Sequence, residues 1–118
     1  MELQVDVWLR GTDFAKTHTI SDIEADPAAW TDQDVSRLLK AMLLSIHRAK
    51  NPQSSDTPVF LRGFSWIVNP FESGGVVIAL EMTLGAVIGG PFDIPESQLT
   101  GMIQRVMDAE RAAVTTVH

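Results

Sequence analysis

The spacing of the apolar residues changes along this chain, and the change limits the possible folds more than any other feature of the sequence. Over residues 2–10, apolar and polar residues alternate, which is the period of a strand with one buried face. Between residues 31 and 50 the apolar residues recur every three or four positions, as in an amphipathic helix. β-Branched and aromatic residues then dominate residues 59–68 and 76–88. Strand patterns on both sides of a helical pattern predict an α+β fold.

The first strand pattern is expected to form a hairpin with the residues that follow it. Gly11, Thr12 and Asp13 have the composition of a turn. Residues 14–20 then carry enough Thr, Phe and Ile to form a second strand. Trp8 falls on the polar face of the first strand, away from the expected core.

The central helical pattern has clear signals at both ends. Thr31 and Asp34 have the spacing of a capping box, in which each side chain bonds to the backbone N–H of the other residue. Asn51 and Pro52 end the helix near residue 50, because the residue before a proline disfavours helical geometry. The apolar residues of this helix share one face, and they are Val35, Leu38, Leu39, Met42, Leu43 and Ile46.

A second hairpin is expected from residues 59–68 and 76–88, which are separated by the turn-forming residues 69–75. If Val68 pairs with Val76, the hairpin has one largely apolar face that should meet the helices. That face carries Phe60, Arg62, Phe64, Trp66, Val68, Val76, Ile78, Leu80, Met82 and Leu84. The opposite face is smaller and mixed, and it carries Val59, Leu61, Gly63, Ser65, Ile67, Val77, Ala79, Glu81 and Thr83.

A second helical stripe follows the last strand pattern. The Gly-Gly-Pro sequence of residues 89–91 is expected to end the sheet, and Asp93 and Glu96 have the spacing of a helix cap. The stripe consists of Leu99, Met102, Ile103, Val106, Met107, Ala113 and Val114. We therefore expect a two-layer sandwich in the order ββαββα, a four-stranded antiparallel sheet with two long helices on one face. The length predicts a single domain over residues 1–118.

The charge and the cysteine content exclude several classes of function. With 15 acidic against 9 basic residues, the net charge of −6 repels a phosphate backbone, so we expect no nucleic-acid partner. The absence of cysteine excludes disulfides, thiolate metal sites and cysteine nucleophiles. The amino terminus lacks the basic and apolar regions of a signal peptide, and no apolar run is long enough to span a membrane. These observations predict a cytoplasmic protein without membrane contact.

No metal or cofactor is expected from the ligand patterns. Acidic residues gather over residues 22–34, but a calcium loop that begins at Asp22 would have Pro27 in place of glycine and Gln33 in place of the bidentate glutamate. The favoured interpretation is that these acids cap helix starts and face solvent. The three histidines lack the spacing of a zinc motif.

No catalytic motif is recognisable. Ser65 lies in a Gly-Phe-Ser-Trp-Ile sequence that begins like a nucleophile elbow, yet it lacks the closing glycine and lies inside a predicted strand. The glycines at 85, 89 and 90 match neither a dinucleotide-binding motif nor a phosphate loop, and they favour a bulge and a chain reversal. We therefore name no catalytic residue, and the sequence favours a non-enzymatic protein without deciding the question.

The leading functional hypothesis is a protein-interaction or assembly module that self-associates. Two helices cover one side of a four-stranded sheet but not both, so the other side must meet water or protein. On the first hairpin that side is polar, whereas on the second hairpin it is apolar and small. A homodimer would bury the candidate interface residues of the second hairpin, which are Val59, Leu61, Ile67, Val77 and Ala79. The competing account is that residues 21–30 fold over this side, anchored by Ile23 and Trp30.

The alternative hypothesis is a small-molecule-binding protein or a modest enzyme with a pocket between the sheet and the helices. The candidate lining residues of this pocket are His18, Arg62, Trp66 and Glu81. Arg62 and Glu81 are charges within apolar strands, and a buried charge needs a partner or a wet edge. In the expected register the two point to opposite faces, so they would not pair with each other.

Overall fold

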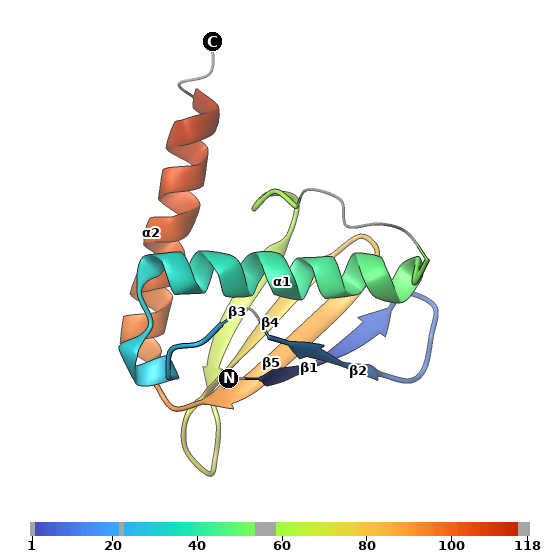
Figure 1. Cartoon of the computed structure of the whole chain (residues 1–118), viewed down its shortest axis with the longest axis horizontal. Helices are drawn as coiled ribbons and strands as arrows, with labels where there is room; N and C mark the ends of the chain where they lie inside the picture. Colours follow the sequence, from blue (N-terminus) through green and yellow to red (C-terminus); the bar gives the residue numbers. More distant parts are fainter. Residues whose placement is uncertain (1, 22, 54–58, 116–118) are drawn as a thin grey trace.

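The protein forms a five-stranded antiparallel sheet with two α-helices on one of its sides, as seen in a computed structural model (Figure 1). The structure describes residues 2–21, 23–53 and 59–115. The strands are β1 (Leu3–Leu9), β2 (Lys16–Ile20), β3 (Ser65–Pro70), β4 (Val76–Met82) and β5 (Gly85–Phe92). The helices are α1 (Asp32–Lys50), α2 (Glu96–Thr115) and the short 3₁₀ helix η1 (Pro27–Ala29). Across the sheet the strands are ordered β2-β1-β5-β4-β3.

The sheet has five strands rather than the predicted four, and the order is ββαβββα, because the last predicted strand contains a turn. β4 ends at Met82 and β5 begins at Gly85, and only two residues connect these paired strands. Arg10 binds this connection: its backbone N–H donates to the Leu84 oxygen at 2.9 Å, and its Nε donates to the Thr83 oxygen at 2.9 Å. β4 and β5 are both interior strands, so apolar residues precede and follow the turn in the sequence. No cluster of turn-forming residues marks its position.

The strand predicted to begin at residue 59 begins only at Ser65. Gly63 has a φ of +74°, a left-handed conformation that interrupts an extended chain. Before this glycine the side chains do not alternate as predicted, because Leu61 is only 2% exposed and belongs to the core, whereas Phe60 is 57% exposed. The predicted alternation of faces is therefore wrong for the chain before β3.

α1 has the boundaries and the buried face that the sequence predicts. The Thr31 hydroxyl accepts the N–H of Asp34 at 3.3 Å and the Asp34 carboxylate accepts the N–H of Thr31 at 3.0 Å, so the capping box is formed. At the other end, the N–H of Asn51 donates to the His47 oxygen at 2.9 Å. All six predicted apolar positions of α1 are buried. The burial of this face contributes most of the stability of such a helix.

A bulge interrupts the pairing of β4 with β5. Gly90 and Pro91 lie opposite Val77, so two residues of one strand face one residue of the other. Gly90 has a φ of +117°, a conformation that favours glycine. β5 continues through this bulge to Phe92, so the prediction that the Gly-Gly-Pro sequence ends the sheet is wrong.

One cluster of buried apolar side chains lies between the sheet and the helices. The described part of residues 21–30 contributes to this core: Ile23 is fully buried, and Trp30 contacts Phe92 edge to face with 5.0 Å between the ring centroids. The Trp30 indole N–H also donates to the Ala25 oxygen at 3.0 Å. The account in which this segment covers the other side of the sheet is therefore wrong. The side chains of Ile23 and Trp30 bury more apolar area inside the core than they would on the open side of the sheet.

α2 packs against α1 and β3, and its carboxyl-terminal end extends past α1 (Figure 1). The predicted stripe is buried up to Val106, while the side chains of Ala113 and Val114 lie outside the described residues. The Arg105 guanidinium donates to both carboxylate oxygens of Asp32, from Nε at 2.9 Å and from Nη2 at 3.0 Å. These hydrogen bonds from Arg105 hold the pKa of Asp32 below its ordinary value.

Candidate interaction surface

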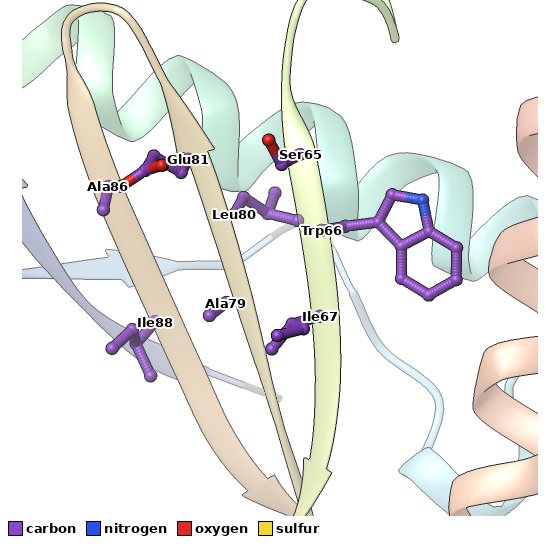
Figure 2. Close-up of a pocket in the computed structure, with 8 residues that line it drawn as sticks. All are labelled: Ser65, Trp66, Ile67, Ala79, Leu80, Glu81, Ala86 and Ile88. Carbon is purple, nitrogen blue, oxygen red and sulfur yellow. The ribbon is translucent and has the colours of Figure 1, made fainter.

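No part of the described chain covers the side of the sheet that points away from the helices, which we call the outer face. α1 lies in front of the sheet in Figure 1 and behind it in Figure 2, where the outer face is turned to the viewer. None of the outer-face side chains is buried. The outer-face residues are Gln4, Asp6 and Trp8 of β1, Thr17 and Thr19 of β2, Ser65, Ile67 and Asn69 of β3, Val77, Ala79 and Glu81 of β4, and Ala86 and Ile88 of β5.

The strand register places a small residue between two large ones near the centre of the outer face. Ala79 of β4 pairs with Ile67 of β3 on one side and with Ile88 of β5 on the other. Adjacent strands lie about 4.8 Å apart, so the two isoleucines form walls about 10 Å apart above an alanine floor. The hollow between them, which we call the Ala79 trough, has a volume of about 270 Å³ (Figure 2). Ile67 is 54% exposed and Ile88 is 38% exposed, so Ile67 is the more prominent wall.

One end of the Ala79 trough is polar. In the next row of the outer face, Ser65 pairs with Glu81, and Glu81 pairs with Ala86. Figure 2 shows the Ser65 and Glu81 side chains on neighbouring strands at the same end of the trough. Asp6 lies farther across the face on β1, where its carboxylate accepts a hydrogen bond from the Thr17 hydroxyl at 2.8 Å. The trough is therefore an apolar hollow with a hydroxyl group and a carboxylate at one end.

Three of the five predicted interface residues lie on the outer face, namely Ile67, Val77 and Ala79. Leu61 lies instead in the core, and Val59 is partly buried against it. Both were assigned to the outer face by extending the strand pattern through a segment that is not a strand. Their placement on this surface is therefore wrong.

The four predicted pocket residues do not converge on one pocket. His18 lies on the inner face of β2 and Trp66 lies on the inner face of β3, and these strands form opposite edges of the sheet. Glu81 lies on the outer face, on the side opposite to His18. Trp66 and Glu81 both border the Ala79 trough, but the Trp66 side chain points away from it (Figure 2). Arg62 is exposed, with its guanidinium carbon 5.0 Å from the centroid of the Phe60 ring.

Sequence reasoning misses Ala86 and Ile88 as surface residues because it treats residues 76–88 as one strand. Gly85, a residue type that weakens the interior of a strand, is the available signal of the turn that precedes them. Trp8 is correctly placed opposite the core, but the register shows in addition that it pairs with Ala86. Trp8 therefore extends the apolar surface toward β1.

Other hollows of the described structure are more polar. One of about 350 Å³ adjoins the polar end of the trough, and its lining includes Arg10, Ser65 and Glu81. A polar crevice of about 220 Å³ lies between the edge strand β2 and α1, and it borders Arg48 and several hydroxyl groups but none of the predicted pocket residues. Within the described ranges, no three His, Asp or Glu side chains gather in a way that could hold a metal ion. Asp22, where the tested calcium loop would begin, lies outside the described residues. No helix among the described residues is long and apolar enough to cross a membrane.

Comparison of the chain with known protein families, with curated proteins and with solved structures finds no match. The outer face and the Ala79 trough are therefore the features of this protein that bear on its function.

Proposed function

We propose that the protein is a non-enzymatic interaction module that self-associates through the outer face of β3, β4 and β5. The observation that supports this proposal is the asymmetry of the sheet, which buries the core on one side and carries the Ala79 trough on the other. Exposed apolar surface of this kind is unfavourable in water, so a complex in which a partner covers it is stabilised. A second copy carries the same surface, and a twofold axis lets the two surfaces bury each other.

The distribution of charge supports the same proposal. Among the eight described residues on the outer face of β3, β4 and β5, one is charged, namely Glu81. Depletion of charge is typical of the centre of a protein interface, because each buried charge costs desolvation energy. A cytoplasmic location belongs to the proposal and is supported by the absence of cysteine.

The proposal predicts a dimer that dissociates on dilution, which sedimentation velocity between micromolar and millimolar concentrations would detect. Ile67→Glu and Val77→Glu each place a carboxylate on the paired surface, so each variant is expected to be folded and monomeric. Its melting temperature should match that of the wild type at concentrations where the wild type is monomeric. Phe14→Glu is the matched control, because Phe14 is 61% exposed but lies in the β1–β2 connection, away from the outer face. This control is expected to dimerise like the wild type.

A wild-type protein that stays monomeric over the whole concentration range would overturn the proposal. A folded Ile67→Glu variant that dimerises as strongly as the wild type would overturn it as well, because the outer face could not then be the interface.

A further inference from the structure

We infer that the two copies pack with Ile67 of each copy seated in the Ala79 trough of the other. This inference rests on the proposed self-association and specifies its contacts. It follows from three observations, which are the register of β3, β4 and β5, the exposure of Ile67, and the position of the Glu81 carboxylate beside the trough.

The shape of the outer face supports this pairing. A twofold axis parallel to the strands and between β3 and β4 places β3 of one copy over β4 of the other. Because Ile67 and Ala79 are paired residues, the same rotation brings each Ile67 over the Ala79 of the other copy. Sheets that pack face to face lie about 10 Å apart with interdigitating side chains. The walls of the trough, also about 10 Å apart, leave room for one isoleucine side chain between them.

The neighbouring pair of outer-face residues, Ser65 and Glu81, supports the same twofold axis. Ser65 and Glu81 are paired residues, so the rotation that seats Ile67 also places Ser65 of one copy opposite Glu81 of the other. The hydroxyl can donate a hydrogen bond to the carboxylate there, which offsets the cost of removing that carboxylate from water. The two Glu81 side chains are offset by one strand spacing, about 5 Å, so each faces a serine hydroxyl rather than the other carboxylate.

Two neighbouring arrangements are less favourable. With β4 packed over β4, Ala79 faces Ala79 and leaves a gap, and Glu81 faces Glu81 with repulsion between like charges. With β4 packed over β5, Ile88 occupies the trough, but Glu81 faces Ala86 and Asp6 faces Ile67, so two carboxylates lose water without gaining a donor. Complementarity therefore selects the arrangement with β3 over β4.

The area of contact determines how tightly the two copies are expected to bind each other. Two overlapping strands of six or seven residues give a contact about 10 Å wide and about 20 Å long. The contact therefore covers about 200 Å² per partner, well below the value of about 800 Å² found in standard stable complexes. We therefore expect a dimer in reversible exchange with the monomer rather than a permanent dimer.

Exchanging the large and the small side chain at positions 67 and 79 tests the inference. Ile67→Ala removes the side chain that enters the trough of the other copy, and Ala79→Ile fills the trough. Each change acts twice in a twofold dimer, so each variant alone is expected to dimerise at least about tenfold more weakly than the wild type. In an equimolar mixture, one contact of the mixed dimer joins Ile67 to Ala79 as in the wild type. The other contact joins the introduced alanine to the introduced isoleucine, so mixing is expected to restore the dimer.

The measurement is sedimentation velocity of each variant, of the mixture, and of the double variant I67A/A79I, which is also expected to dimerise. Both positions are solvent-accessible, and circular dichroism verifies that each variant is folded. Gln4→Ala, on the outer face of β1 but outside the contact, is the control that should leave dimerisation unchanged. If the wild type dimerises but the mixture stays as weak as the separate variants, this arrangement is wrong while self-association stands. A monomeric wild type instead overturns the proposed function itself.

Discussion

At the residue scale, Gly85 lies where β1 passes too close to β5 to leave room for a Cβ atom. It pairs with Leu9 at the end of the β1–β5 ladder and with Met82 beside the β4–β5 turn. A Cβ atom at this position would overlap the Trp8 carbonyl oxygen and lie 3.0 Å from the Leu9 Cα. The neighbours are backbone atoms, so they cannot move aside without disturbing the ladder.

Gly85→Ala is therefore expected to destabilise the protein by about 1–3 kcal/mol, because the added methyl group forces β1 and β5 apart. The matched control is Gly101→Ala in α2, where the nearest atom is the end of the flexible Arg105 side chain at 3.4 Å. This control is expected to stabilise the protein by about 0.5–1 kcal/mol, since alanine favours a helix interior over glycine. Urea unfolding measures both, and a Gly85→Ala variant as stable as the wild type would contradict the close approach of the two strands.

At the element scale, each long helix has one apolar face and buries it in the same core. Leu39 in α1 and Ile103 in α2 are both fully buried in the middle of these faces. Leu39→Ala and Ile103→Ala are each expected to destabilise the protein by about 2–5 kcal/mol through lost burial and a residual cavity. Arg37→Ala, on the exposed face of α1, is expected to cost less than about 0.5 kcal/mol. Denaturant titrations that gave similar small losses for all three would show that the buried faces are wrongly assigned.

At the scale of the whole molecule, the contact between Arg105 and Asp32 joins α2 to the first turn of α1 and links stability to pH. The pKa of Asp32 is lowered in the folded protein by the hydrogen bonds from Arg105. A carboxyl group whose pKa is lowered on folding contributes stability above its unfolded pKa, about 3.9, and the contribution is lost as the pH falls through the folded value. Both side chains are largely exposed, so solvent screening keeps the contribution small.

Arg105→Gln is therefore expected to be slightly less stable than the wild type at neutral pH. The difference should shrink as the pH falls below the ordinary pKa of aspartate. It should disappear once the pH has fallen through the lowered pKa of Asp32 in the wild type. Unfolding titrations of the two proteins over this pH range measure the effect. A difference that stays constant or grows in acid would contradict the assigned role of the pair.

The sequence by itself determined the elements whose signals are local. The capping box of Thr31 and Asp34, the buried stripe of α1 and the polar side of β1 depend on residues within one or two turns of each other, so periodicity and capping chemistry predict them. The α+β class follows from the same patterns. The position of Ile67, Val77 and Ala79 away from the core was also predictable, because alternation within a real strand determines the face of each residue.

Only the tertiary structure decided the features that depend on contacts between distant segments. The turn between β4 and β5 is held by Arg10 from β1, and Gly85 fits there because β1 passes beside it, so no pattern within residues 76–88 reveals the fifth strand. Leu61 enters the core although its segment is not a strand, and Ile23 and Trp30 enter the core rather than covering the outer face. The Ala79 trough itself exists because three strands from two hairpins align Ile67, Ala79 and Ile88 in one row. Register between strands is a property of packing, and a one-residue shift would turn every one of these side chains to the other face.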